Sequence, residues 1–212
     1  MAGRRFAIVG NGPVAADAEA AILSADCVIR FNDCRSAGAL AHRTDIVAVC
    51  NTGRPGKAMT EEPAWRLNPA VMAAGEIWSI RDPRMFAAMR APLSLTHPEL
   101  DDFCDDYTDG FAAICAADGK RHVVLPAVTH KRLAQELSAL DPAPFVVPST
   151  GLIVIAEVLW NHAGAGDAIL LSGFGHQGWE WHPWEAERLW VEAHVAAGRL
   201  SRLVAAPAEL AG

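Results

Sequence analysis

Pro148-Ser149-Thr150-Gly151-Leu152-Ile153-Val154-Ile155 decides the fold, because it predicts a capped helix start that runs into an apolar helical pattern ending near Asn161. The strand pattern that follows, Asp167 to Ser172, ends in Gly173-Phe174-Gly175. Ser149 or Thr150 is the expected N-cap, and Gly151 lets the backbone approach another group closely. A helix start with hydroxyls and free N–H groups favours anion binding, although an ordinary capped core helix has the same pattern.

Strand and helix patterns alternate along the rest of the chain. The expected strands are residues 5–9, 26–31, 45–49, 76–80 and 121–125, and the expected helices are 14–24, 83–90, 100–117, 129–140 and 183–198. Gly and Pro residues predict loops at 50–69 and 92–98 and a break near Asp109-Gly110. The alternation predicts an α/β fold with a mostly parallel twisted sheet and helices on both faces. We expect one Rossmann-like domain spanning residues 1–212.

Composition narrows the class of protein. The chain has 212 residues, and its hydrophobic content of 51% argues against disorder. Its formal net charge of −7 argues against nucleic acid or an anionic membrane as the main partner. Arg4-Arg5 leads directly into a strand pattern and Glu157 interrupts the best apolar run, so we expect neither a signal peptide nor a transmembrane segment.

Neither the cysteines nor the acidic residues have metal-ligand spacing. The five cysteines lack zinc-site patterns, and we interpret them as reduced thiols of a cytoplasmic protein. The acidic cluster between Asp101 and Asp109 lacks the EF-hand spacing, which favours a solvated helix face. We therefore expect no metal site.

Two turns carry candidate ligand groups. Gly10-Asn11-Gly12-Pro13-Val14-Ala15 matches the loose form GxGxxA, with Asp33 about twenty residues further on. This pattern indicates either a dinucleotide phosphate turn or a tight turn between a strand and a helix. Asn32 follows the second strand, where it offers amide groups to a ligand or forms an Asx turn.

Three segments together resemble the sialyltransferases (glycosyltransferase family 29). Phe6 to Gly12 and Asp26 to Asn32 are similar to the long sialyl motif of that family, and Pro148 to Gly151 with Leu170 to Gly175 is similar to the short motif. His182-Pro183-Trp184-Glu185-Ala186-Glu187 is similar to the very short motif, a His and a Glu separated by four residues. The three segments have the family's order, whereas residues 50–147 match none of its motifs.

The resemblance implies a variant GT-A-like fold and a site for a CMP-linked sugar acid, such as sialic acid or Kdo. Asn11 and Asn32, with Gly10 and Gly12, would hold the nucleotide, and Ser149, Thr150, Gly151 and Gly173 would surround its ribose and phosphate. His182 would be the general base of an inverting, metal-independent transfer to a glycan acceptor, paired with Glu187. The CMP-sugar would be a substrate, with no further cofactor.

Some features depart from that family. The bridge between its long and short motifs cannot form, because no cysteine lies beyond Cys115. His176 is the one candidate to steady the departing phosphate. Trp179, Trp181, Trp184 and Trp190 suggest either an acceptor platform or packing of a loop on the core. His182 is also a candidate N-cap, with Pro183 at the first helical position.

We therefore expect a soluble, cytoplasmic sialyltransferase-like glycosyltransferase. One alternative is an NAD- or FAD-dependent oxidoreductase that uses the GxGxxA turn. A second alternative is a catalytically silent accessory protein that binds CMP or another nucleotide. The sequence does not predict the oligomeric state.

Overall fold

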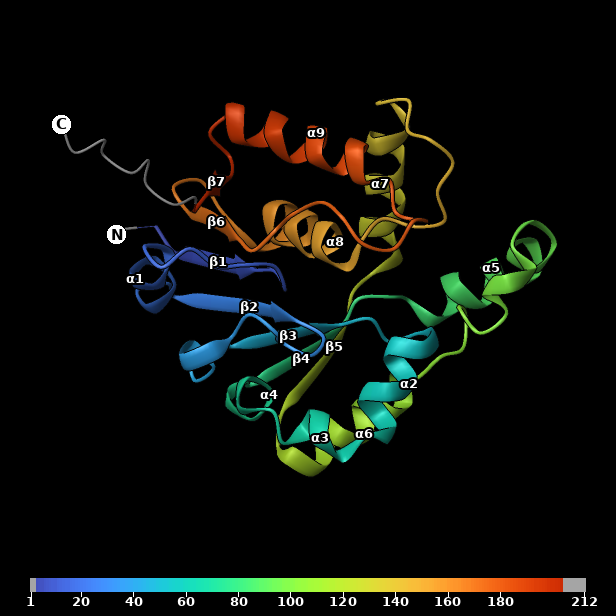
Figure 1. Cartoon of the computed structure of the whole chain (residues 1–212), viewed down its shortest axis with the longest axis horizontal. Coiled ribbons are helices and arrows are strands. Elements are labelled where there is room, and N and C mark those ends of the chain that lie inside the picture. Colours follow the sequence, from blue (N-terminus) through green and yellow to red (C-terminus); the bar gives the residue numbers. More distant parts are fainter. Residues whose placement is uncertain (1–2, 204–212) are drawn as a thin grey trace.

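The computed structural model describes residues 3–203 as a seven-stranded parallel sheet with helices on both faces. Figure 1 shows the sheet in the middle of the molecule, with helices above and below it. The strand order is β5-β4-β3-β2-β1-β6-β7. The strands are β1 (Arg5–Val9), β2 (Cys27–Phe31), β3 (Ile46–Val49), β4 (Glu76–Ser79), β5 (Arg121–Val124), β6 (Ala168–Ser172) and β7 (Ser201–Arg202). The Rossmann-like α/β fold predicted from the sequence is confirmed.

Successive side chains along each strand point to opposite faces of the sheet and pack against different helices. Phe6 and Ile8 of β1 face a core with α7 (Ala127–Ser138), α8 (Thr150–Glu157) and α9 (Trp184–Ala196). Ala7 and Val9 face the opposite side, against α1 (Ala18–Leu23). Farther along the sheet, that opposite side is covered by α2 (Gly53–Glu61), α3 (Pro63–Arg66), α4 (Pro69–Ala73) and α6 (Thr108–Asp118). This two-sided burial explains the almost uninterrupted apolar strands.

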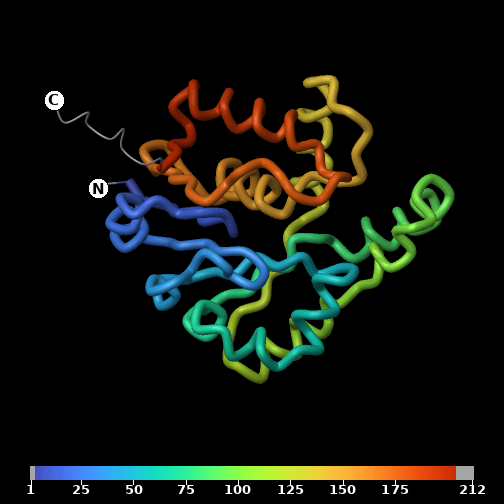
Figure 2. The backbone as a smooth tube through the Cα atoms, in the orientation of Figure 1, coloured from blue at the N-terminus to red at the C-terminus, as the bar shows by residue number. Residues whose placement is uncertain are grey.

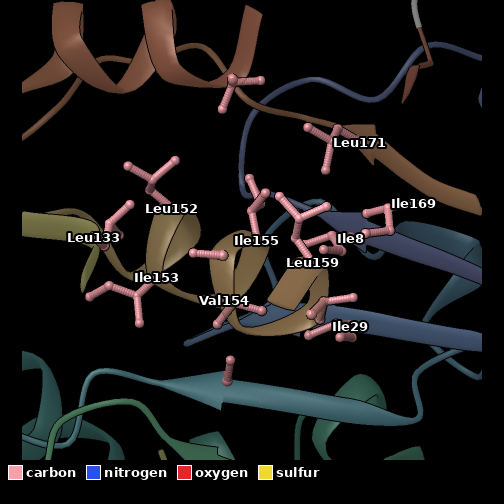
Figure 3. Close-up of a cluster of buried hydrophobic side chains, with 14 of the residues drawn as sticks. Ile8, Ile29, Leu133, Leu152, Ile153, Val154, Ile155, Leu159, Ile169 and Leu171 are labelled. Atoms are coloured by element: carbon pink, nitrogen blue, oxygen red, sulfur yellow. The ribbon is translucent and has the colours of Figure 1, made fainter. Parts of the chain in front are cut away.

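Helix α8 is the most enclosed helix of the described chain. Every residue from Leu152 to Glu157 is buried, and Figure 3 shows Leu152, Ile153 and Ile155 among side chains from α7, β1 and β6. The helix begins at the N-cap Ser149, whose hydroxyl accepts a hydrogen bond from the Leu152 N–H at 3.2 Å. A π-helical turn, Val158–His162, extends it. The capped helix predicted from Pro148 to Ile155 is confirmed.

Prolines and glycines account for most differences from the predicted elements. Residues 50–69 are largely helical rather than a loop, because Pro63 and Pro69 occupy first helical positions where a missing N–H costs nothing. The helix α5 (Pro83–Thr96) runs through Pro92 to its C-cap, where the His97 N–H donates to the Leu93 carbonyl at 2.7 Å. Figure 1 shows α5 projecting from the rest of the molecule.

Other boundaries differ by a few residues. The expected break at Asp109-Gly110 is wrong, because α6 begins at Thr108, where the Asp106 carboxylate accepts hydrogen bonds from the Thr108 N–H and hydroxyl. Helix α1 begins at Ala18 rather than near Val14. The short edge strand β7 was not predicted, since two residues carry no periodic signal.

Candidate functional site

A cleft of about 590 Å³ lies at the carboxyl ends of the central strands. Its floor contains Asn32 after β2, Thr52 after β3, Arg81 after β4 and Thr150 at the first position of α8. Ligands of open α/β sheets bind at this edge, outside the carboxyl ends of the strands. The cleft is therefore the candidate functional site.

The loop between β6 and α9 forms one wall of the cleft. Trp179, Trp181 and His182 line the cavity, and the indole of Trp179 stacks on Phe103 with ring centroids 5.4 Å apart. The loop meets the segment before α8, where the Val146 N–H donates to the Trp181 carbonyl at 3.0 Å. Figure 2 shows both connections, yellow and orange, on the α8 side of the sheet. The contact between the two connections fixes the tryptophan-bearing wall relative to the α8 N-terminus.

His182 is a neutral histidine in the cleft wall. Its Nδ1 lies 2.8 Å from the Val147 carbonyl oxygen, which only accepts, so Nδ1 carries the proton and Nε2 keeps its lone pair. Burial lowers the pKa of His182 to about 4, with the hydrogen bond to Val147 opposing that effect and Arg81 adding to it. The N-cap position of α9 is held by Pro183, so the expectation that His182 caps this helix is wrong.

Glu187 forms hydrogen bonds with Ser149, the N-cap residue of α8. Its two carboxylate oxygens accept from the Ser149 N–H and the Ser149 hydroxyl, both at 2.6 Å. Burial raises the pKa of Glu187 to about 7, while the two hydrogen bonds oppose the rise. Ser149 and Glu187 are both buried and neither lines the cleft. They position the neighbouring Thr150.

The glycine turn at Gly10-Asn11-Gly12 packs against the loop after β6. The Gly12 N–H donates to the Gly173 carbonyl at 3.0 Å, and a Cβ added to Gly10 would lie 2.4 Å from that oxygen. The amide that a phosphate-binding turn would offer is therefore already bonded. Asp33 pairs with Arg35 at 3.1 Å. The structure thus contradicts the oxidoreductase alternative based on this turn.

The two predicted asparagines have different roles. Asn11 has a structural role, because its side-chain amide bonds the backbone at the end of the neighbouring strand β2 and just after it. Its Nδ2 donates to the Phe31 carbonyl at 3.1 Å, and its Oδ1 accepts from the Arg35 N–H at 3.0 Å. Asn32 adopts a left-handed φ of 50°, and its Oδ1 accepts from the Cys50 N–H at 2.9 Å. Of this pair, Asn32 alone lines the cleft.

Other predicted residues lie outside the cleft. His176 lies 2.9 Å from Arg202 through its Nε2, at the β7 edge of the sheet. Gly151 faces Phe174, because a Cβ on Gly151 would lie 2.8 Å from that ring. Trp190 is buried in the core, and Trp184 donates from its indole to the Trp179 carbonyl at 3.0 Å. The four tryptophans thus divide between the cleft wall and packing.

Arg81 and Thr52 are cleft residues that the sequence analysis missed, and Arg81 is the charged one. Its side chain is 4% exposed, and its guanidinium lies over the rings of Phe86 and Phe103, 4.8 and 4.5 Å from their centroids. Asn51 anchors its backbone, accepting from the Arg81 N–H at 2.9 Å and donating to its carbonyl at 3.0 Å. The available signal was a charged residue directly after the apolar strand Ile77-Trp78-Ser79-Ile80.

Residues 3–203 include neither a metal-binding cluster nor a membrane-spanning helix. These residues contain no group of three or more His, Cys, Asp or Glu side chains arranged to hold a metal ion, and none of their helices has the length and hydropathy of a membrane span. The expectations of no metal and no cofactor stay predictions. The five cysteines are free thiols.

Comparison with known proteins identifies the fold and then the family. The fold is similar to that of a mammalian sialyltransferase crystal structure, with a TM-score of 0.54 and 16% identity over 95% of this chain and 69% of that chain. No protein-family model matches the chain. The chain is 54% identical over 203 residues to the urease operon 23 kDa accessory protein of Rhizobium meliloti (strain 1021), covering 96% of this chain and 94% of that protein. The chain belongs to the family of that accessory protein.

This relationship corrects the predicted activity. The expected transfer of a sugar acid from a CMP-sugar to a glycan acceptor is wrong, and so are the expected enzyme class and partners, because the relative at 54% identity is a urease operon accessory protein. Neither alternative, oxidoreductase or nucleotide-binding protein, describes an accessory protein of urease. The likeness to a sialyltransferase at 16% identity shows the fold alone. The sequence motifs therefore indicated the fold correctly and the chemistry wrongly.

Proposed function

We propose that this chain is an accessory protein of urease that acts by binding a component of the urease system. The observation that carries the proposal is the 54% identity to the Rhizobium meliloti protein over 96% of the chain. An accessory role of this kind places the protein in the cytoplasm. The free thiols accord with that reducing compartment.

The test is deletion of the gene in a bacterium that carries it together with a urease operon. We expect urease activity in the lysate to fall while growth without urea is unchanged, and a plasmid copy of the gene to restore the activity. The amount of urease protein, measured by immunoblot, separates a loss of assembly or activation from a loss of expression. Unchanged urease activity after deletion would show that the accessory role is wrong.

We further propose that the cleft is the binding site of this accessory protein. Three cleft residues support this assignment: Asn32 after β2, Thr150 at the start of α8 and His182 in the loop before α9. His182 and His176 give a matched pair, since His176 is another partly buried histidine of the same loop but lies outside the cleft. We expect His182→Ala to complement the deletion poorly and His176→Ala to complement it fully. Equal complementation by both variants would exclude the cleft and leave the accessory role standing.

A further inference from the structure

Arg81 is a buried cation without a counter-ion in the part of the chain that the structure describes. The adjacent carboxylate, Asp82, pairs with Arg84 at 3.1 Å instead. The Arg81 Nη1 group donates to the Thr52 hydroxyl, its Nε has no hydrogen-bond partner, and no bond from Nη2 to residues 3–203 is formed. Buried charges in proteins are ordinarily paired or bound to a ligand. This unpaired guanidinium therefore points to a partner from outside the chain.

The aromatic rings around Arg81 do not replace that partner. Phe86 and Phe103 cover the guanidinium and shield it from water. A cation–π contact is weaker than the cost of removing a charge from water, so the two rings position the charge without neutralising it. Arg81 nevertheless lines the cavity, and its Nε has no hydrogen-bond partner among residues 3–203. The N–H edge of a guanidinium is the part that forms paired hydrogen bonds with an oxyanion.

Two further groups around the cleft favour negative charge. The hydroxyl of Thr52, which is fully buried, accepts from Arg81 and so keeps its own proton to donate. Thr150 lines the cavity at the first position of α8, an eight-residue helix lengthened by the π-helical turn. The N-terminus of a helix carries partial positive charge and free N–H groups. Donors from the segments after β3 and β4 and from the start of α8 thus lie around one cavity.

We propose that the cleft binds a small molecule through a phosphate or carboxylate group held by Arg81, with Thr52 and Thr150 beside it. Carboxylates of the cleft lining limit the negative charge that a ligand can carry. Glu99 and Glu180 line the cleft and are exposed, and Asp102 pairs with Arg54 at 2.6 Å. These carboxylates repel a large polyanion such as a nucleic acid more strongly than a small molecule with one oxyanion group. This inference concerns the purified chain and does not depend on the accessory role.

The test measures thermal unfolding of the purified full-length protein with inorganic phosphate, with acetate and with chloride at equal ionic strength. A ligand that binds the native state raises the melting temperature in proportion to the logarithm of its concentration. We expect phosphate, acetate or both to raise the melting temperature relative to chloride, and the comparison of the two identifies the preferred group. Arg81→Met should abolish this rise. Arg30→Met is the matched control, because Arg30 is also buried and unpaired but lines none of the described cavities, and it should retain the rise.

Arg81→Lys covers the case in which Arg81→Met does not fold. Lysine keeps the charge and loses the planar fork, so the rise should shrink while the protein stays folded. An equal rise in the wild type, the Arg81 variants and Arg30→Met would reflect general ion exclusion and would overturn the proposal. Stabilisation of the wild type by neither anion would overturn it as well.

Discussion

Arg30 and Arg81 are two buried arginines with similar contacts and different surroundings. Arg30 is 1% exposed and donates from Nε to the Thr44 hydroxyl at 3.2 Å, just as Arg81 donates to the hydroxyl of Thr52. Burial lowers the pKa of both. Arg30 lies within β2 with two unpartnered nitrogens and lines none of the described cavities, whereas Arg81 follows β4 and lines the cleft. A buried unpaired charge thus indicates a ligand site only where an opening leads to it.

The largest expected effect concerns the residue that fixes Arg81. Asn51 is fully buried and bonds the Arg81 N–H, the Arg81 carbonyl and the Thr108 hydroxyl. Asn51→Ala leaves the Arg81 N–H and carbonyl unpaired, whereas the Thr108 hydroxyl keeps its bond to Asp106. At about 1–3 kcal/mol for each of the two buried backbone groups, the free energy of unfolding should fall by about 2–6 kcal/mol. Urea unfolding followed by circular dichroism measures the loss.

The control for that variant is Asn68→Ala. Asn68 caps α4 by accepting from the Ala70 N–H at 2.9 Å, but it is partly exposed, so its removal should cost about 1 kcal/mol. If Asn51→Ala costs no more than this control, the Arg81 backbone is held by other contacts and the contrast with Arg30 weakens.

Glu187 sharpens the comparison as a buried ionisable group that does have hydrogen-bond partners. Its pKa is raised from 4.5 to about 7 in the folded state, so between these pH values the folded protein holds a proton that the unfolded chain releases. Stability should therefore fall as pH rises through this window, by roughly 3 kcal/mol for a shift of this size. Glu187→Gln should remove this decline.

The measurement is urea unfolding of both proteins at pH 5 and pH 7. His130 and His182 have pKa values lowered from 6.5 to about 4, so they make stability rise as the pH increases between these values. The informative quantity is therefore the difference in stability between wild type and variant at each pH. Parallel pH profiles for the two proteins would show that Glu187 stays ionised, held by Ser149.

Replacing Arg30, which lines none of the described cavities, should change the free energy of unfolding by a smaller amount and in the opposite direction. Arg30→Met removes an unpaired buried charge and keeps a similar volume, so the free energy of unfolding should rise by about 1–2 kcal/mol. Arg81→Met should gain less, because it also loses two cation–π contacts worth about 0.5–2 kcal/mol each. Chemical denaturation compares the two variants. A marked loss of stability in Arg30→Met would reveal a compensating partner inside the protein, such as bound water.

The smallest effect should follow Arg84→Ala, which frees Asp82 from its exposed partner. Arg84 is 92% exposed, and an exposed ion pair of this kind contributes little to stability. The urea midpoint and the stabilisation by phosphate or acetate should both match the wild type. Loss of the anion effect alone would show that Asp82 can turn to Arg81 and act as its counter-ion, which would remove the difference between the two arginines.

Local sequence signals were sufficient for the sheet and the start of α8. The apolar strands and the Ser149 cap depend on neighbours in sequence, and both were predicted. The helices within residues 50–69 were not predicted, because Gly and Pro usually indicate turns. Gly53 and Pro63 instead stand at the first positions of α2 and α3. Pro92 misled the prediction in the same way, since its helix continues beyond it.

The cleft itself could be predicted only in part. Thr150 and His182 belong to recognisable motifs and do line it. Ser149 and Glu187 belong to the same motifs, yet they bond each other behind the cavity, a separation that depends on a contact across 38 residues. Arg81 belongs to no motif, and its lack of a counter-ion is visible only when Asp82 is seen to turn toward Arg84.

The close approach of Gly10, Gly12 and Gly173 has a consequence for protein engineering. Backbone oxygens there lie where any side chain would begin: a Cβ on Gly173 would stand 2.7 Å from the Gly10 oxygen, and one on Gly12 would stand 2.8 Å from the Gly173 oxygen. Saturation mutagenesis at these three positions should return glycine alone among folded clones. Grafting a dinucleotide site onto this scaffold would require rebuilding the loop after β6, whereas the cleft beside α8 can be redesigned one side chain at a time.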